Sequence, residues 1–237
     1  MSAYKCLANY YNRFTTEDAD YNAWSKFILA HISATATKGV DLACGTGKMT
    51  RILASNRLDV TGMDASAEML SQATAQGGKC RYVCQSLQEF ATPSRVDFVT
   101  VVNDGLNYLT SAELSAFFAK AYASLKSGGT LIFDISSHYK LSQVVGNNVF
   151  FVDDEDVTCL WNNTFDGDKV QMDLTFFVKD GQTYQRFDET HVQYAHQTEQ
   201  VQIQLTQAGF AVQIFDCYSQ DLPNDTTQRV TFVATKQ

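Results

Sequence analysis

The chain has 237 residues, of which 45% are hydrophobic and 19% charged, and its formal net charge at pH 7 is −8. This length fits one α/β domain with an insertion better than two independent domains. The negative charge disfavours nucleic acid and anionic membrane as partners, because association would begin against electrostatic repulsion. The six cysteines form no Cys-x-x-Cys pair and share no ligand spacing with histidine, which predicts no metal site and a reducing, cytoplasmic location.

The first part of the chain predicts helices followed by an alternation of strands and helices. Helices are expected at 3–11 and 21–34, and the second has an apolar stripe at helical spacing. Strands are then expected at 40–44, 58–63, 80–84, 96–102 and 130–135, with helices near 47–55, 66–76 and 111–126. Strands that alternate with helices indicate a parallel, doubly wound sheet.

The pattern changes between residues 148 and 195. This segment has no convincing helix, and it contains two Asp-Gly pairs, Asp166-Gly167 and Asp180-Gly181, between runs of alternating apolar residues. Asp-Gly is a strong hairpin signal, so we expect an inserted antiparallel sheet of three or four strands. A helix near 198–207 and an antiparallel pair of strands at 210–217 and 229–235 then complete the main sheet.

A turn with two glycines follows the first predicted strand. The run is Val40-Asp41-Leu42-Ala43-Cys44-Gly45-Thr46-Gly47-Lys48. Open α/β sheets bind ligands beyond the carboxyl ends of their strands, where glycine allows the backbone to approach closely. The second strand ends in Asp64, and a carboxylate there can accept hydrogen bonds from both hydroxyls of a ribose. The two strand ends together predict a nucleoside-binding site.

The residues around this turn narrow the choice of nucleoside. A dinucleotide site needs a third glycine, which this turn lacks. A P-loop needs glycine where this chain has Leu42, and Ser or Thr where it has Met49. Asp41 would repel a pyrophosphate and favour a cation. S-adenosylmethionine has a ribose and a positive sulfonium and lacks phosphate, so it is the predicted ligand.

The run from Asp41 to Gly47 resembles motif I of the class I S-adenosylmethionine-dependent methyltransferases (EC 2.1.1.-). The resemblance implies a Rossmann-like, mainly parallel seven-stranded sheet whose last strand is antiparallel, with S-adenosylmethionine as cofactor. Residues 83–90 resemble the segment that flanks the adenine in this fold, although Ser86 stands where the family often has Asp. Residues 184–194 and 226–232 are similar to a subgroup of small bacterial methyltransferases of largely unassigned substrate. Amino-sugar N-methyltransferases are similar in architecture.

The resemblance also implies roles for individual residues. The residues expected to bind the cofactor are Trp24, Asp41, Ala43, Cys44, Gly45, Gly47, Asp64, Ala65, Met69, Ser86, Leu87 and Asn103. His191 is a candidate base that Glu189 would orient, and His138 is a second candidate. Tyr21 and Trp24 would close over the sulfonium, where an aromatic ring stabilises positive charge. Core packing for Trp24, a structural Glu189–His191 hydrogen bond and a solvated loop position for His138 are the alternatives.

The predicted protein is therefore a methyltransferase that acts on nitrogen or oxygen of a small-molecule acceptor. Residues 1–147 and 196–237 would form the core with an N-terminal helical lid, and residues 148–195 would cover the acceptor site. No apolar run is long enough to span a bilayer, so no membrane partner is expected, and the protein would be a monomer or homodimer. An RNA methyltransferase and a non-catalytic cofactor-binding regulator or assembly partner are the alternatives.

Overall fold

The structure is a computed structural model that describes residues 8, 10, 11 and 19–237. Most of the helix expected at 3–11 lies outside the described residues, as do Cys6 and Asn12; residues 8, 10 and 11 are helical. In the described part of the chain, no helix combines the length and the apolar character needed to cross a membrane.

The core is a seven-stranded sheet in the order β10-β11-β5-β4-β1-β2-β3. Its strands are β1 (Lys38–Leu42), β2 (Asp59–Asp64), β3 (Arg81–Cys84), β4 (Val96–Val101), β5 (Leu125–Ser136), β10 (Phe210–Asp216) and β11 (Arg229–Lys236). Neighbouring strands from β3 to β5 pair in parallel, whereas β11 runs antiparallel to both β5 and β10. The predicted fold class, including the antiparallel last strand, is confirmed.

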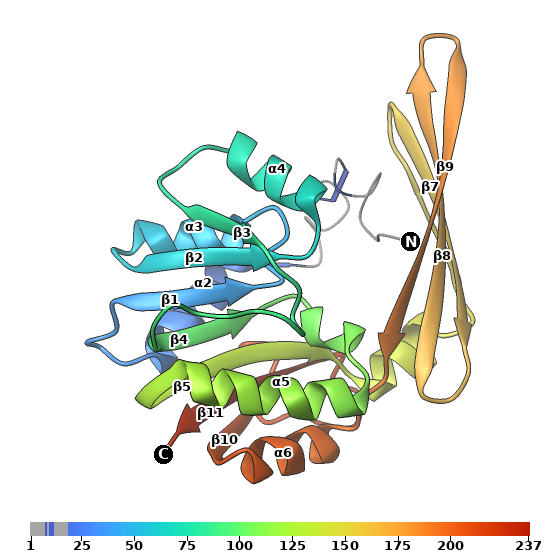
Figure 1. Ribbon diagram of the computed structural model, residues 1–237. Helices are drawn as coiled ribbons and strands as arrows, with labels where there is room; N and C mark the ends of the chain where they lie inside the picture. The colour runs from blue at the N-terminus through green and yellow to red at the C-terminus, as the bar shows by residue number, and fades with distance from the viewer. Residues whose placement is uncertain (1–7, 9, 12–18) are drawn as a thin grey trace.

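Helices cover both faces of this sheet (Figure 1). They are α2 (Tyr21–His31), α3 (Lys48–Ser55), α4 (Ala67–Ala75), α5 (Ser111–Ser124) and α6 (Thr198–Gln207). One apolar cluster joins α5 and α6 to one face, through residues such as Phe118 and Leu205. A second cluster joins α2 and α3 to the other face, through residues such as Ile28 and Leu53. Burial of these apolar stripes fixes the helices on the sheet.

Helix α5 begins at Ser111, as the sequence predicted. Thr110 is the N-cap: its hydroxyl accepts from the Glu113 backbone N–H at 3.3 Å, and Glu113 Oε2 accepts from the Thr110 N–H at 2.8 Å. This reciprocal capping box satisfies two backbone donors that a helix end leaves open. Strand β5 starts at Leu125, before the predicted residue 130, and Gly128 and Gly129 lie inside it next to a register shift against β4.

Residues after β5 form a separate four-stranded antiparallel sheet in the order β6-β7-β8-β9. Its strands are β6 (Val149–Asp153), β7 (Val157–Phe165), β8 (Lys169–Asp180) and β9 (Thr183–Tyr194). The two Asp-Gly turns join β7 to β8 and β8 to β9, as predicted, and both glycines have the left-handed φ that such turns require. Figure 1 shows this insert sheet standing beside the carboxyl ends of the core strands.

Two short helical turns that the prediction missed lie next to the insert sheet. They are the 3₁₀ turn η1 (Gly105–Tyr108), which follows β4, and the π-helical turn η2 (Lys140–Val145), which follows β5. Leu141 and Val145 of η2 pack on the buried face of the insert sheet together with Met172 and Phe176 of β8. These apolar contacts pack the insert sheet against η2.

Candidate active site

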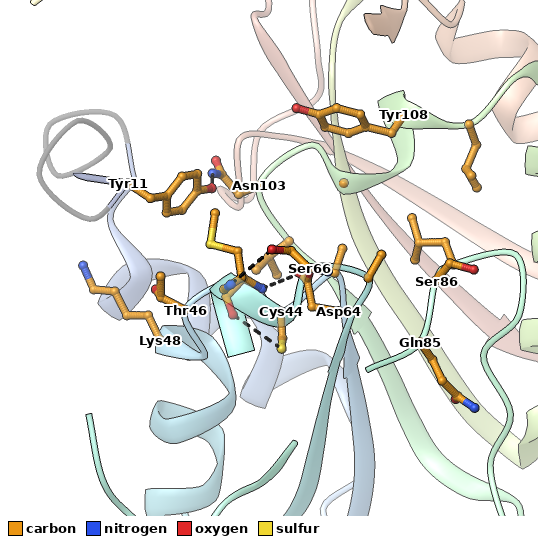
Figure 2. Close-up of a pocket in the computed structure, with 18 of the residues that line it drawn as sticks. Tyr11, Cys44, Thr46, Lys48, Asp64, Ser66, Gln85, Ser86, Asn103 and Tyr108 are labelled. Atoms are coloured by element: carbon orange, nitrogen blue, oxygen red, sulfur yellow. Dashed lines mark hydrogen bonds between the residues drawn. The ribbon is translucent and has the colours of Figure 1, made fainter. Parts of the chain in front are cut away.

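A cavity of about 440 Å³ lies at the carboxyl ends of β1, β2 and β4 (Figure 2). Its volume is in the range of small-molecule sites. Of the residues expected to bind a cofactor, nine line it: Ala43, Cys44, Gly45, Asp64, Ala65, Met69, Ser86, Leu87 and Asn103. Tyr21 lines it as well. These nine and Tyr21 are half of the twenty residues that line the cavity.

The turn after β1 has the backbone shape that its glycines suggested. Ala43, Gly45 and Gly47 all have positive φ, at 49°, 54° and 71°. A Cβ at Gly45 would meet nothing within 4 Å, so this residue faces open space in the cavity wall. A Cβ at Gly47 would instead overlap the Tyr82 side chain. Gly45 thus allows close approach of a ligand, whereas Gly47 serves packing and does not line the cavity.

Asp64 connects the turn after β1 to the start of α4. Its Oδ2 accepts from the Gly45 N–H at 2.8 Å, and its Oδ1 accepts from the Ser66 N–H at 2.8 Å. Burial raises the pKa of this carboxyl, and the backbone hydrogen bonds oppose that effect. The carboxylate is thereby fixed at the middle of the cavity, between Lys48 and Thr46 at one end and Gln85 and Ser86 at the other (Figure 2).

Asp41 was expected to contact the cofactor, but it lies beneath the turn and does not line the cavity. It is fully buried and accepts from the Thr50 hydroxyl at 2.6 Å and the Thr100 hydroxyl at 2.9 Å. Burial raises its pKa from 3.8 to about 6, although both hydroxyls lower it. Asp41 therefore ties α3 and β4 to β1 and supports the turn from below.

Trp24 was also expected at the cofactor, and the structure places it in the core instead. Its side chain is 3% exposed and stacks on Tyr218 with ring centroids 4.9 Å apart. The Arg229 guanidinium lies 5.0 Å from the Trp24 ring centroid. The packing alternative fits this position, because a helical aromatic stripe that faces a sheet is buried there.

Several residues of the cavity wall were not assigned to the cofactor from the sequence. They are Tyr11, Thr46, Lys48, Ser66, Gln85, Gln88, Val102, Gly105, Tyr108 and Leu109. Lys48 is the most informative of them, since its Nζ lies 4.6 Å from the Tyr21 ring centroid at one end of the cavity. Its position directly after Gly47, in the first turn of α3, was the available signal.

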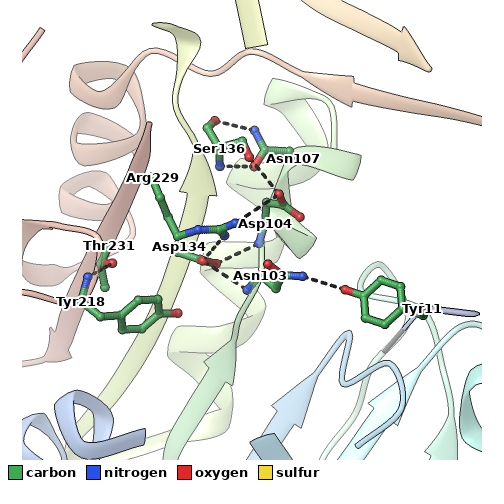
Figure 3. Close-up of polar contacts among 9 residues, drawn as sticks. All are labelled: Tyr11, Asn103, Asp104, Asn107, Asp134, Ser136, Tyr218, Arg229 and Thr231. Carbon is green, nitrogen blue, oxygen red and sulfur yellow. Dashed lines mark hydrogen bonds and ion pairs between the residues drawn. The ribbon is translucent and has the colours of Figure 1, made fainter. Parts of the chain in front are cut away.

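A polar network holds the end of β4 in a strained shape (Figure 3). Asn103 and Asp104 have positive φ, at 62° and 56°, which is uncommon for residues other than glycine. Asp134 of β5 accepts from both backbone N–H groups, at 3.2 and 2.8 Å, and Arg229 of β11 pairs with Asp134. Asn103 is thereby positioned to donate to the Tyr11 hydroxyl at 2.7 Å.

The charges within this network compensate one another. Burial opposes the charge on Arg229, but the carboxylates of Asp134 and Asp104 outweigh burial and raise its pKa. Burial raises the pKa of Asp134, and Arg229 lowers it. Breaking such a buried pair on one side leaves an uncompensated charge, so the strained strand end is strongly fixed.

A second cavity of about 180 Å³ lies between the core and the insert sheet. It shares Tyr11, Asn103 and Tyr108 with the first cavity, so the two meet at these side chains. The insert contributes mainly apolar and aromatic walls, including Phe150, Trp161, Met172 and Leu174. Its polar lining includes Asp104, Ser136, Lys140, His191, Gln193 and Arg229.

His191 and Glu189 lie on the buried face of β9, at 3% and 8% exposure. His191 Nε2 is 3.3 Å from Glu189 Oε2, and His191 Nδ1 is 3.2 Å from the Tyr108 hydroxyl.

His138, the other candidate base, lines neither cavity: its Nδ1 is 3.5 Å from the Ser142 hydroxyl, and its ring packs against Phe165. Its expected position at the reacting groups is not supported. Among the described residues, no group of three His, Cys, Asp or Glu side chains is placed to hold a metal ion.

Comparison with known proteins agrees with this geometry. Residues 40–129, which contain the glycine turn and Asp64, match a family described as the methyltransferase domain. A Geobacillus protein named provisionally as a methyltransferase is 34% identical, with 98% of this chain and 99% of that protein covered. The crystal structure of an S-adenosylmethionine-dependent methyltransferase from Clostridium acetobutylicum is 36% identical, with 98% of each chain covered and a TM-score of 0.88.

The chain belongs to the S-adenosylmethionine-dependent methyltransferases. The cofactor of this methyltransferase is accordingly S-adenosylmethionine, as predicted. The sugar N-methyltransferase KedS8 from Streptoalloteichus shares the fold, with a TM-score of 0.82 over 100% of this chain and 94% of that protein. At 18% identity this likeness shows the fold alone.

The residues of the first cavity fit this cofactor. Asp64 offers a fixed carboxylate at mid-cavity, Leu87 and Met69 offer apolar surface at one end, and Lys48 offers a cation at the other. Apolar surface, a carboxylate and a cation thus follow one another along the cavity, in the order in which a nucleoside with an amino-acid tail presents a base, a ribose and a carboxylate. A diphosphate in the middle of the cavity would face the Asp64 carboxylate.

Proposed function

We propose that this methyltransferase transfers a methyl group to nitrogen or oxygen of a small-molecule acceptor held in the second cavity. The observation that carries the proposal is the meeting of the two cavities at Tyr11, Asn103 and Tyr108. An acceptor in one cavity and a cofactor in the other would face each other across these side chains. Rate enhancement then comes mainly from holding the reacting atoms in line in a closed site.

The cofactor supplies a methyl group on a positively charged sulfonium, and the chain's residues hold it. We assign the ribose to Asp64, the adenine to Ser86 and Leu87, and the amino-acid tail to Lys48. Tyr21 closes the same end of the cavity, where its buried ring lies beside Lys48. Asn103 faces the junction with the second cavity, where the methyl group would lie.

A small acceptor is supported by the second cavity and by the charge of the chain. The volume of about 180 Å³ suits a compact molecule, and its apolar walls come largely from the insert, residues 148–195. A net charge of −8 disfavours RNA.

The experiment is a transfer assay with S-adenosyl-[methyl-³H]methionine against separate pools of amines, amino sugars, carboxylates and transcribed RNA. We expect label in one of the small-molecule pools and none in RNA. Asp64→Ala should lower transfer at limiting cofactor, whereas Asp59→Ala should not, because Asp59 lies at the opposite end of β2 with a side chain 60% exposed. Label in RNA alone would overturn the proposal in favour of the RNA alternative. Absence of S-adenosylhomocysteine binding would overturn the assignment of the first cavity.

A further inference from the structure

The hydrogen-bond chain from Tyr108 through His191 to Glu189 has features that simple docking of the insert does not require. Across β8 and β9, His191 pairs with Met172 and Glu189 pairs with Leu174, and both partners are buried and apolar. An imidazole and a carboxylate are costly to bury beside such residues. Apolar side chains at these two positions would pack β9 against the core without the free-energy cost of burying polar groups.

The chain of contacts also has a direction. With Glu189 ionised, its carboxylate can only accept hydrogen bonds, and the contact at 3.3 Å then requires the proton on His191 Nε2. In the neutral ring, Nδ1 is then the acceptor, and it receives the Tyr108 O–H at 3.2 Å. Any further hydrogen bond to the Tyr108 oxygen must then be donated to it, and Tyr108 lies where the two cavities meet.

We infer that Tyr108 is a catalytic residue that receives the proton of the acceptor group, and that His191 and Glu189 act through it. This inference rests on the proposed function. As the bond between the acceptor atom and the methyl carbon forms, the carbon–sulfur bond breaks and its electron pair returns to sulfur. The acceptor atom gives its proton to the Tyr108 oxygen, and the Tyr108 proton passes to His191 Nδ1. Glu189 stabilises the resulting imidazolium, which later releases the proton to solvent.

The direction of the chain selects a class of acceptor. A group that donates to Tyr108 must carry a proton, so the acceptor presents a hydroxyl or an amine rather than a thioether or a tertiary amine. The cavity walls at Phe150, Trp161 and Leu174 select an apolar body for the same molecule. The predicted acceptor is a small apolar molecule with one protic group at the end that faces the cofactor.

Two other charged groups of this cavity, Arg229 and Asp104, belong to the polar network at the end of β4. Arg229 pairs with Asp134, and Asp104 accepts from the Ser136 hydroxyl at 2.8 Å. Lys140 lies on η2 and lines the same cavity. These charges, together with Tyr11, are the titratable neighbours whose state must be held constant when the protonation of His191 is measured.

The test is ¹⁵N NMR of the His191 ring in the S-adenosylhomocysteine complex at constant pH near 8. Three probes share one body: 2-phenylethanol, 2-phenylethylamine and propylbenzene, which replaces the protic group by a methyl. We expect the proton on Nε2, and a change in the Nδ1 signal with the alcohol and the amine but not with propylbenzene. In Tyr108→Phe no probe should change that signal. Tyr184→Phe is the matched control, because Tyr184 lies on the same strand as His191 and is 60% exposed.

A kinetic measurement complements the spectra. Transfer of tritium to 2-phenylethylamine should fall at least about 100-fold in Tyr108→Phe and in His191→Ala, and the double variant should fall no further. Affinity for S-adenosylhomocysteine should stay within about twofold in each variant. A purely structural His191 would give unequal, additive losses that follow the loss of stability.

Three results would overturn the inference: a proton on Nδ1 of the resting ring, an equal effect of propylbenzene, or no effect of either protic probe. Each is distinguishable from failure of the proposed function, which appears as lost binding of S-adenosylhomocysteine. The proton position on His191 is measurable in the protein alone and does not depend on that binding.

Discussion

The buried Asp41 carboxyl makes stability depend on pH in a direction opposite to that of most carboxylates. Asp41→Asn removes the titrating proton and keeps the size of the side chain. A carboxyl whose pKa is higher in the folded chain binds its proton more tightly there. The stability that it contributes is complete below pH 3.8 and is lost as the pH rises to about 6.

The size of this change in stability follows from the rise in the pKa of Asp41. A rise from 3.8 to about 6 corresponds to about 3 kcal/mol of unfolding free energy. About 2 kcal/mol of this falls between pH 4.5 and pH 7.5. The unfolding free energy of the native chain minus that of Asp41→Asn should therefore decrease by about 2 kcal/mol across this range.

Urea denaturation at several pH values measures this difference, because all other titrations are common to the two proteins. The free energy of unfolding of Asp41→Asn should increase relative to that of the native chain as the pH rises. A difference that stays constant within about 0.5 kcal/mol, or that grows with pH, would refute the reasoning. That result would show that the Thr50 and Thr100 hydroxyls hold the carboxylate ionised at low pH.

Three further predictions concern single residues. Asp64→Ala should weaken S-adenosylhomocysteine binding by about 1–3 kcal/mol in calorimetry, whereas equal loss in Asp59→Ala would argue against a ribose contact. Gly39→Ala should lower the unfolding free energy by about 1–3 kcal/mol, because its Cβ would overlap the buried Phe98 ring; an unchanged urea midpoint would contradict this. Thr110→Ala should cost about 1 kcal/mol through loss of the N-cap of α5, and an equal cost in Ser111→Ala would contradict the assignment of the cap to Thr110.

Much of the fold was predictable because local signals agreed with the tertiary structure. The alternation of strands and helices gave the order of the core, and the Asp-Gly pairs gave two turns of the insert. The turns η1 and η2 were missed because their shape depends on contacts with the insert and with β5, not on local periodicity. The start of β5 was missed because glycines that commonly end a helix form an irregularity within the strand.

The site was predictable where it depends on strand ends and unpredictable where it depends on packing. The positions of Gly45 and Asp64 follow from β1 and β2 being parallel neighbours. The acidic residue of the same motif, Asp41, points into the layer beneath because strand residues alternate between faces. An aromatic residue such as Trp24 can bind a ligand or pack in the core. Its packing partner Tyr218 is distant in the sequence, so the stacking that buries Trp24 could not be predicted. The link between Tyr108 and His191 spans 83 positions, which no local pattern reveals.

The two cavities are encoded by largely separate stretches of the chain. Apart from the shared Tyr11, Asn103 and Tyr108, the first cavity draws on residues up to Leu109, and the second draws on residues from Asp104 onward, chiefly those of η2 and the insert. Substitutions can therefore accumulate in the insert without touching the wall that faces the nucleoside. Under the proposed function, substitutions in η2 and the insert can change the acceptor while the residues proposed to hold the cofactor stay the same.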